Sequence, residues 1–394
     1  MRYLVAVDDC FLDAPGGMGR VAWDIAMLMR ERGHEIAMVS IEHRPGATAS
    51  SLQVEQDVPI LRYLRPNVPS WHPRRARLIL NTITQAVHTH LPGRKWDIVH
   101  MHTPFTGLGV QRAIGAGPRY VYTLHSPSVP EQEINWAKQG FVGQLKMLFG
   151  RPALNRLEHE ALAPTAVIHT LSQYCRRQVE HYHGLGQRVQ VIPHWRRAEL
   201  RRTMTQAEAR RQLGWPENER VFFTIRRLGP RYGLDLAIRA VAPLLGKGKA
   251  RFALGGDGPW RGLLENVARE SGVAESVHFL GRMSDEQLVL AYQAADLFLL
   301  PTLALECFGI IILEALSFGC PVLSSDTCAI PELMQPILPD FIVPAGDQAA
   351  LRAKAGAFLS GELRSPPPEQ LIRYVDDGFS REAIAPKLIA MLEG

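Results

Sequence analysis

The chain has 394 residues, of which 46% are hydrophobic and 21% are charged, and its formal net charge is +5. This length and apolar content are sufficient for two domains of ordinary size, each with its own hydrophobic core. The mild basic excess is spread along the chain, so it suits phosphorylated ligands or an anionic membrane surface and argues against nucleic acid as a partner.

The cysteine pattern and the hydropathy of the chain favour an intracellular location. The five cysteines are odd in number and scattered, without the spacing of metal ligands, and we interpret them as reduced thiols. The first residues, MRYLVAVDD, place charges within a short apolar run, which is typical of a buried strand rather than a secretion signal. No segment approaches the roughly 18 uninterrupted apolar residues of a membrane-spanning helix. We therefore expect a cytoplasmic protein that is soluble or sits peripherally at the inner membrane face.

The first half of the chain alternates short β-rich runs with helical segments. A strand over residues 3–7 precedes a Gly-rich turn at 15–20, an amphipathic helix over 21–32 that ends at Gly33, and a strand over 35–40. Further strands are predicted at 97–101, 119–124, 167–171 and 189–192. Because short apolar runs between helices are typical of parallel sheets covered on both faces, this half predicts a parallel α/β domain.

A second α/β series follows a polar, arginine-rich stretch at 194–216, which we interpret as a connector and a solvated helix. Its strands are predicted at 221–226, 251–254, 276–279, 297–300, 321–324 and 341–343. Two similar halves are the simplest account of this order. We expect one domain over 1–195, a second over 196–375, and a C-terminal helix within 376–394 that packs on either of them.

The strongest functional signal is the segment ECFGIIILE, followed by ALSFGCPV. A strand leads through a short loop into a helix that begins near Gly309, and the first N–H groups of this helix, on Gly309, Ile310 and Ile311, predict an anion site. Glu306 precedes the helix, where it can accept hydrogen bonds from sugar hydroxyls, and Glu314 lies one turn inside, within reach of a ribose diol. Two carboxylates around an anion site fit a nucleotide sugar.

A second signal is the segment TIRRLGPRYG, which follows the first strand of the second half. Pro230 and Gly233 enforce a loop before the next helix. We expect Arg227 and Arg231 to project from this loop toward the ligand, since guanidinium groups bind phosphate in a bidentate manner.

These motifs resemble those of a known family. The string E-x-F-G-x-x-x-x-E-A-x-x-x-G-x-P-V resembles the signature of the retaining family-four glycosyltransferases, also described as glycosyl transferases group 1. The resemblance implies the GT-B fold, in which two Rossmann-like α/β domains face each other across a cleft that holds the donor. It also implies that Glu306 contacts the transferred sugar, that Glu314 holds the ribose, and that an arginine and a lysine neutralise the diphosphate. Arg231 stands near the usual lysine position, with Tyr232 directly before the glycine, so the residue that takes the lysine role stays open.

Weaker resemblances extend the predicted site. The turn GGMG, which contains Gly17, resembles the family's first loop, and by itself a Gly-rich turn is equally consistent with a plain turn. His125 resembles the histidine that family members present to the donor sugar. His100 and His102 match the stretch D-x-x-H-x-H, although histidines at strand ends are usually structural. The loop HFLGR resembles one that lines the nucleotide pocket and places Arg282 beside the base.

Two basic or amphipathic stretches have two interpretations. Residues 61–77 contain five arginines with tyrosine, tryptophan and histidine, and residues 134–149 place Ile134, Phe141, Leu145 and Leu148 near one helical face. Either they form an acceptor site or an interfacial patch for a lipid-linked acceptor, or they are core-facing helix and solvated loop, which we favour. The sequence IPHW at 192–195 departs from the I-P-N-G of many relatives, so the acceptor pocket is not predicted.

We therefore expect a retaining glycosyltransferase that moves a hexosyl unit from a UDP- or GDP-sugar to the hydroxyl of a glycan, a lipid-linked or a small-molecule acceptor. No cluster of ligands suggests a metal ion, and no other cofactor is implied. Two alternatives stay open: an epimerase of the same fold that acts on the nucleotide sugar itself, and a non-catalytic module that binds sugar nucleotides. The sequence predicts neither the acceptor nor the oligomeric state.

Overall fold

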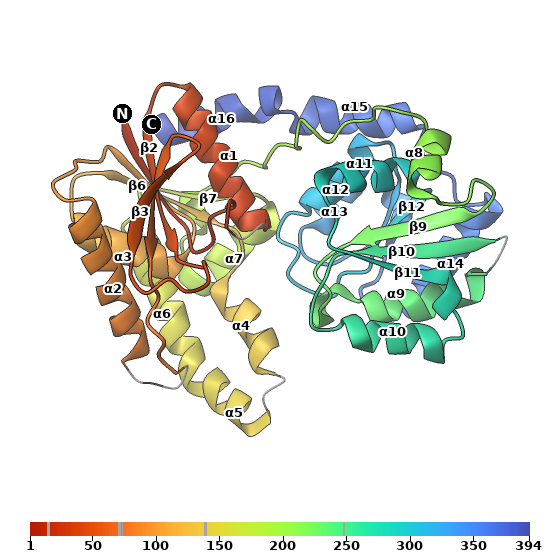
Figure 1. Cartoon of the computed structure of the whole chain (residues 1–394), viewed down its shortest axis with the longest axis horizontal. Coiled ribbons are helices and arrows are strands. Elements are labelled where there is room, and N and C mark those ends of the chain that lie inside the picture. The colour runs from red at the N-terminus through yellow and green to blue at the C-terminus, as the bar shows by residue number, and fades with distance from the viewer. Residues whose placement is uncertain (14–15, 70–71, 73, 138–139, 247–248) are drawn as a thin grey trace. The chain divides into compact units, whose positions relative to one another are not determined.

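The computed structural model describes residues 1–13, 16–69, 72, 74–137, 140–246 and 249–394. The chain divides into two compact units. Unit 1 comprises Met1–Pro193 together with Ala385–Gly394, and unit 2 comprises His194–Ile384. Each unit is an α/β domain built on a largely parallel sheet (Figure 1), which confirms the fold class expected from the sequence.

Unit 1 contains an eight-stranded sheet in the order β3-β4-β2-β1-β5-β6-β7-β8. Its strands are β1 (Arg2–Ala6), β2 (Glu35–Ile41), β3 (Ser51–Glu55), β4 (Val58–Tyr63), β5 (Ile98–Met101), β6 (Arg119–Leu124), β7 (Val167–Thr170) and β8 (Val189–Val191). The pairs are parallel except β3–β4, which is antiparallel. The core strands are buried on both faces, as the continuous apolar runs predict.

The helices of unit 1 are α1 (Gly17–Glu31), α2 (Arg75–His90), α3 (Pro104–Ile114), α4 (Ser128–Trp136), α5 (Gly140–Leu145), α6 (Arg151–Leu162) and α7 (Gln173–His183), with a π-helical turn over Lys146–Gly150. The sheet grows from β1 in both directions, first through β2 and then through β5. Because parallel crossovers are right-handed, these two directions place their helices on opposite faces of the sheet.

The β3–β4 hairpin was not predicted from the sequence. Its two-residue turn, Gln56 and Asp57, has φ values of 48° and 60°, the backbone of a type I′ turn without the usual Asn-Gly. β3 is the edge strand, and its side chains are only partly buried. Neither the turn nor the strand therefore carries the composition that normally marks a hairpin.

Unit 2 contains a six-stranded parallel sheet in the order β11-β10-β9-β12-β13-β14. Its strands are β9 (Arg220–Ile225), β10 (Ala250–Gly255), β11 (Val277–Gly281), β12 (Leu297–Leu300), β13 (Val322–Ser325) and β14 (Ile342–Val343). Its helices are α8 (Gln206–Leu213), α9 (Leu234–Val241), α10 (Arg261–Glu270), α11 (Asp285–Ala294), α12 (Ile310–Ser317), α13 (Ile330–Met334), α14 (Gln348–Ser360) and α15 (Pro368–Phe379). The sheet reverses its direction of growth between β9 and β12, which is the topological switch point at which open α/β sheets bind ligands.

Helix α8 differs from the solvated helix predicted for the connector. Ala209 and Arg210 are buried, and the Arg210 guanidinium pairs with Asp296 at 2.5 Å and donates to the carbonyl of Ala294 at 2.9 Å. Asp296 precedes β12 and also accepts the Val221 N–H. One charged residue of this helix, Arg210, therefore forms a buried ion pair that attaches the helix to the sheet of unit 2.

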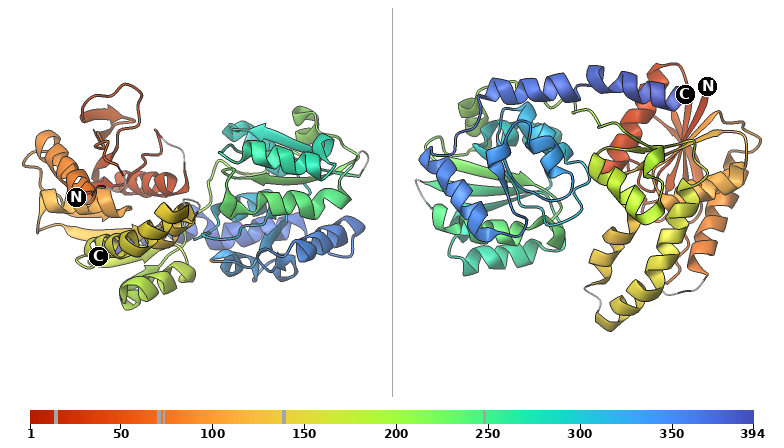
Figure 2. Two further views of the ribbon diagram at one scale, coloured as in Figure 1. Left: turned by 90° about the horizontal axis from the view of Figure 1, so that it is seen from below. Right: turned by 180° about the vertical axis from the view of Figure 1, so that it is seen from behind.

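The last helix, α16 (Arg381–Glu393), starts in unit 2, and its residues from Ala385 onward belong to unit 1. There Glu393 accepts from His34 at 2.9 Å, and Arg119 donates to the carbonyl of Met391 at 3.2 Å. Figures 1 and 2 show both termini beside the sheet of unit 1. None of the helices in the described ranges has the length and apolar character needed to cross a membrane.

Candidate functional site

The candidate site lies at the switch point of unit 2, where two loops leave adjacent parallel strands. One loop, 226–233, follows β9, and the other, 301–309, follows β12. Because parallel strands end at the same edge of the sheet, the arginine segment and the ECFG segment meet there. The two strongest signals in the sequence therefore belong to one site.

Arg226 joins the two loops. Its guanidinium lies 2.5 Å from a carboxylate oxygen of Glu306 and donates to the Thr302 hydroxyl at 3.0 Å. Its central carbon also lies 4.5 Å from the centre of the Tyr232 ring. The side chains of Arg226 and Glu306 are only 10% and 14% exposed, so the pair is shielded from water and holds the Glu306 carboxylate in one place.

The neighbouring Arg227 does not take part in this pair, and its predicted contact with the ligand stays a prediction. It is exposed, and it forms no hydrogen bond or ion pair with any described residue. Consecutive residues of an extended segment point to opposite sides, and here the side chain of Arg226 is the one directed toward Glu306. The sequence analysis missed Arg226, and because β9 is buried on both faces, its burial pattern does not distinguish Arg226 from Arg227.

Arg231 also connects the two loops, through hydrogen bonds with backbone groups of the loop 301–309. Its guanidinium donates to the carbonyl of Leu305 at 2.9 Å and to the Tyr232 hydroxyl at 2.9 Å, and its own carbonyl accepts the Leu303 N–H at 2.8 Å. Leu305 has a φ of 58°, which is strained for a branched side chain, and it directly precedes Glu306. Arg231 therefore stabilises the backbone that presents Glu306, in addition to any contact with phosphate.

Close backbone packing explains three glycines of this edge. A Cβ at Gly233 would lie 2.1 Å from the carbonyl oxygen of Pro301, and one at Gly256 would lie 1.9 Å from that of Arg226. A Cβ at Gly258 would lie 2.3 Å from the carbonyl oxygen of Leu228. The loops after β9, β10 and β12 are thus held together at backbone distance, which only glycine permits.

Helix α12 begins as the sequence predicts. Gly309 is its N-cap residue, has a φ of 92° and provides no side-chain cap. The first N–H groups of a helix have no acceptor within it, so those of Gly309, Ile310 and Ile311 point to the space before the helix and favour an anion.

Glu314 lies inside helix α12 and is buried. It accepts a hydrogen bond from the Tyr292 hydroxyl at 3.0 Å. Burial, followed by the nearby Glu314 carboxylate, raises the pKa of Tyr292 well above its ordinary value, so the phenol stays a donor. The Tyr292 hydroxyl therefore fixes one oxygen of Glu314, and the contact of Glu314 with a ribose stays a prediction.

Arg282, which was predicted to lie beside the base, is exposed, whereas Arg226 and Glu306 are shielded from water. It follows β11, its side chain is 91% exposed, and its nearest acidic partner is Asp257 at 4.0 Å. The structure neither brings it to Glu306 nor fixes its orientation. Its contact with a base stays a prediction.

Unit 1 has its own switch point, between β1 and β5. There Asp8 accepts from the hydroxyls of Thr103 at 2.6 Å and Thr106 at 2.5 Å. In the Gly-rich turn, Pro15 lies outside the described residues. A Cβ at Gly19 would lie 2.7 Å from the carbonyl oxygen of Asp9, whereas one at Gly17 would meet no atom of a described residue within 4 Å. Packing thus explains Gly19 and leaves Gly17 open to a ligand.

The predicted histidines form one network in unit 1, in which His100 and His102 are buried and His125 is partly exposed. His102 Nδ1 and His125 Nε2 lie 2.8 Å apart, and the rings of His100 and His102 are 4.2 Å apart. His100 also bonds to the Tyr3 hydroxyl at 2.5 Å and to Thr123 at 2.6 Å. Burial lowers the pKa of His100 well below its ordinary value. These contacts support the structural interpretation of His100, while a sugar contact of His125 stays a prediction.

The basic stretch at 61–77 is in part a core feature, not a surface. Arg62 is fully buried, with its guanidinium 2.7 Å from Asp13 and 2.9 Å from Glu55. Tyr63 is also fully buried and bonds to Thr106 at 2.8 Å. Because an unpaired buried charge is costly, the two carboxylates are what allow an arginine inside the sheet. Trp71, Lys138 and the side chain of Phe141 lie outside the described residues.

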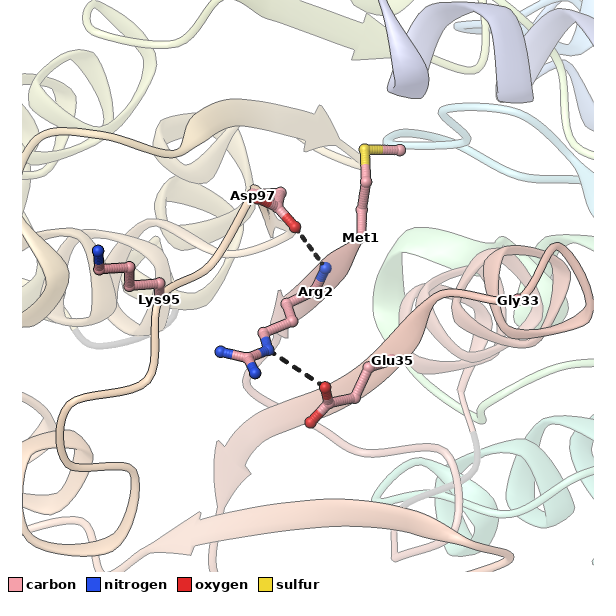
Figure 3. Close-up of a pocket in the computed structure, with 6 residues that line it drawn as sticks. All are labelled: Met1, Arg2, Gly33, Glu35, Lys95 and Asp97. Atoms are coloured by element: carbon pink, nitrogen blue, oxygen red, sulfur yellow. Dashed lines mark hydrogen bonds and ion pairs between the residues drawn. The ribbon is translucent and has the colours of Figure 1, made fainter.

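A pocket in unit 1 lies away from the switch point of that unit. Figure 3 shows this space of about 420 Å³, in which Arg2 donates to Asp97 at 2.7 Å and to Glu35 at 3.2 Å. Its lining residues are Met1, Arg2, Gly33, Glu35, Lys95 and Asp97. They stand at the amino ends of β1, β2 and β5, whereas ligands of α/β sheets bind at the carboxyl ends. Within the described residues, no group of three histidine, cysteine or acidic side chains could hold a metal ion.

Comparisons with known proteins identify the family of the chain. The model of the Glycosyltransferase Family 4 matches residues 15–197, and that of the Glycosyl transferases group 1 matches residues 205–376. An uncharacterized glycosyltransferase of Methanocaldococcus jannaschii is 32% identical over 32% of this chain, and the D-inositol 3-phosphate glycosyltransferase of Acidothermus cellulolyticus is 27% identical over 68%. The matches span 32% and 61% of those two proteins, less than two thirds of each.

Solved structures match the whole chain. The sucrose-phosphate synthase of Thermosynechococcus elongatus superposes with a TM-score of 0.81 at 19% identity, covering 100% of this chain and 98% of that one. HepE of Anabaena, in complex with UDP and glucose, gives a TM-score of 0.77 at 20% identity, covering 100% and 99%. With the two family models together spanning most of the sequence, the chain belongs to the group 1 glycosyltransferases of GT-B fold.

Proposed function

We propose that the protein is a retaining hexosyltransferase that moves a hexosyl unit from a UDP- or GDP-sugar to a hydroxyl group of an acceptor. The observation that supports this most is the shielded pair of Arg226 and Glu306 at the switch point, three residues before the uncapped start of α12. A fixed carboxylate suits sugar hydroxyls, and free N–H groups suit a diphosphate. The complex of HepE with UDP and glucose, on the same fold, is consistent with such a donor.

In this proposal the three arginines have separate tasks. Arg226 holds Glu306, which accepts hydrogen bonds from the transferred sugar, and Arg231 holds the backbone before it. Arg227 is the exposed cation that reaches the diphosphate, together with the N–H groups that start α12. Glu314 accepts from the ribose diol. This assignment keeps the predicted residues and adds Arg226 as a positioning residue.

The chemistry follows from this arrangement. The bond between the anomeric carbon and the diphosphate oxygen breaks, and the acceptor oxygen bonds to that carbon on the same face. The departing phosphate oxygen takes the proton of the acceptor hydroxyl, so the nucleoside diphosphate leaves and the anomeric configuration is retained. One charge-assisted hydrogen bond contributes about 1.5–3 kcal/mol and a helix start up to about 2 kcal/mol. This is less than the roughly 8–23 kcal/mol that enzymes supply, so orientation of donor and acceptor contributes the rest.

The proposal includes independence from metal ions, since cationic side chains and the helix start stabilise the leaving group. The test is donor turnover in the presence of EDTA. Unchanged turnover supports this part, and loss of turnover that is restored by added Mg²⁺ or Mn²⁺ contradicts it.

The test of the function itself is incubation with UDP-glucose or GDP-mannose and NMR of the products. Transfer gives the nucleoside diphosphate and a glycoside of the acceptor with the anomeric configuration of the donor. Slow hydrolysis in the absence of acceptor gives the nucleoside diphosphate and the free sugar. An epimerised nucleotide sugar in the absence of acceptor would instead identify an epimerase. Binding without any turnover would identify a binding module.

A further inference from the structure

Glu158 of α6 is a buried charged residue of unit 1 that the candidate site does not use. Its side chain is 1% exposed, and so is that of His183, whose Nε2 donates to one carboxylate oxygen at 3.1 Å. The other oxygen accepts the Ser128 hydroxyl at 2.6 Å and the Ser128 N–H at 3.1 Å. Three helices, α4, α6 and α7 (Figure 1), therefore meet at one carboxylate.

The burial of this carboxylate indicates a task other than stability. Removing a carboxylate from water is costly, and well-packed apolar side chains of similar volume are often as stabilising as a buried ion pair. Directed hydrogen bonds to a buried charge instead fix the position of the groups that donate them. Ser128 is the residue that Glu158 holds at two points, through its hydroxyl and through its backbone.

Ser128 is the first residue of α4, and Glu158 caps this helix from outside. The N-cap residue, Pro127, forms no side-chain cap, so the first N–H groups of α4 need another acceptor. Glu158 accepts the N–H of Ser128 from the neighbouring helix. Pro127 is buried and has a restricted φ, so the short segment 125–128 has little freedom once Ser128 is fixed.

His125 stands at the other end of this segment, directly after β6. On that side it is held by the strand and by His102, whose Nδ1 lies 2.8 Å from His125 Nε2. The segment 125–128 is therefore anchored at both ends, by β6 and His102 at its start and by Glu158 at its end. His125 is partly exposed, whereas the Glu158 carboxylate that anchors the segment is shielded from water.

We propose that Glu158 is a positioning residue of the transfer reaction, which acts through Ser128 on His125. This role rests on the proposed function and on the predicted contact of His125 with the donor sugar. Glu158 is buried and touches no substrate itself, so loss of its charge leaves the donor-binding residues of unit 2 in place and releases the segment 125–128. A small displacement of a group that contacts the reacting sugar lowers the rate of the chemical step more than it weakens donor binding.

The experiment measures kcat and the donor KM from the release of UDP or GDP from UDP-glucose or GDP-mannose. We expect Glu158→Gln, which keeps the size of the side chain, to lower kcat by about tenfold to a hundredfold at an unchanged KM. Ser128→Ala removes only the hydroxyl bond and should lower kcat less. Glu160→Gln is the matched control on the same helix, because Glu160 is 40% exposed and pairs only with surface arginines, and it should behave as the parent. Circular dichroism verifies that each variant is folded.

A double variant separates positioning from a merely structural role. If Glu158 acts through His125, then Glu158→Gln adds no further loss to His125→Ala, and the double variant keeps the kcat of His125→Ala. A structural effect that is independent of His125 would instead multiply with the loss in His125→Ala. If Glu158→Gln does not fold, Ser128→Ala takes its place in the same cycle.

Parent-like kcat in Glu158→Gln, multiplied losses in the double variant, or full turnover in His125→Ala would overturn the proposal. A raised donor KM at unchanged kcat would overturn it as well, because Glu158 would then act on binding. A parent chain that releases neither UDP nor GDP contradicts the proposed function and with it this role of Glu158. Release by the parent together with an unaffected Glu158→Gln contradicts the role of Glu158 alone.

Discussion

Among single residues, Glu306 carries the most specific expectation. Its carboxylate is fixed by Arg226, and its replacement by glutamine keeps the size of the side chain while removing the charge. We expect Glu306→Gln to lower kcat/KM for the donor by about tenfold to a hundredfold, the worth of one charge-assisted hydrogen bond. Glu362→Gln, an exposed change in the same unit, is the control and should leave turnover intact. Equal turnover in both variants would contradict the proposed role.

The two adjacent arginines give a second expectation, which separates positioning from ligand binding. Arg226→Gln leaves the shielded carboxylate of Glu306 without its partner, and we expect a loss of about 1–3 kcal/mol in unfolding free energy together with a fall in kcat. Arg227→Gln removes an exposed charge, so stability should stay within about 0.5 kcal/mol while UDP binds more weakly. Thermal unfolding and calorimetric titration with UDP measure the two effects. A loss of stability in Arg227→Gln together with weaker UDP binding in Arg226→Gln would contradict this assignment.

Residue-level prediction from the sequence succeeded where the backbone decides the outcome and failed where one side chain decides it. The start of α12 at Gly309 follows from the apolar run that begins there, and glycine permits the φ of 92° with which the chain enters the helix. The choice between Arg226 and Arg227 depends on which face of β9 continues into the loop. Phe222, Phe223 and Thr224 are all buried, so the composition of this central strand does not show which of the two arginines faces Glu306.

At the level of elements, the site depends on backbone contact between the loops at the carboxyl edge of the unit 2 sheet. Gly256 has a φ of 101° and no room for a Cβ beside the Arg226 carbonyl. We expect Gly256→Ala to destabilise the chain by about 1–3 kcal/mol from its backbone conformation alone, and further through the clash. Gly262→Ala, on α10 with no atom within 4 Å, should be neutral or stabilising by up to about 1 kcal/mol. Urea unfolding compares them, and similar stabilities would contradict the packing argument.

The elements themselves were largely predictable, for a physical reason. Buried parallel strands are continuous apolar runs, so the predicted strand 119–124 has the same bounds as β6. The hairpin of β3 and β4 was not predicted because its edge strand is half exposed and its turn lacks glycine. The burial of Arg62 and Arg210 was not predicted either, since the sequence does not show whether a carboxylate lies beside an arginine in the folded chain.

For the molecule as a whole, the buried His100 makes stability depend on pH. Its pKa in the folded chain lies well below 6.5, mainly because of burial, so the unfolded chain binds a proton that the folded chain does not. The unfolding free energy should therefore fall as pH decreases below about 6.5, by up to about 1.4 kcal/mol per pH unit for this group, and this contribution is fully present above that pH. Urea unfolding between pH 7 and pH 5.5, roughly the range in which histidine titrates, measures the slope.

His100→Gln should reduce that slope, whatever its effect on stability at neutral pH. His181→Gln, an exposed change on α7, is the control and should retain the slope of the parent. A slope that is unchanged in His100→Gln would show that other groups govern the acid sensitivity of the chain.

The central claim is that this glycosyltransferase draws its sugar from a nucleoside diphosphate donor bound at the switch point of unit 2. The most direct measurement is the release of UDP or GDP from UDP-glucose and GDP-mannose by the parent chain and by Glu306→Gln. The claim predicts release from at least one donor by the parent, with a loss of about tenfold or more in the variant. Release that is equal in the parent and the variant, or absent with both donors, would contradict it.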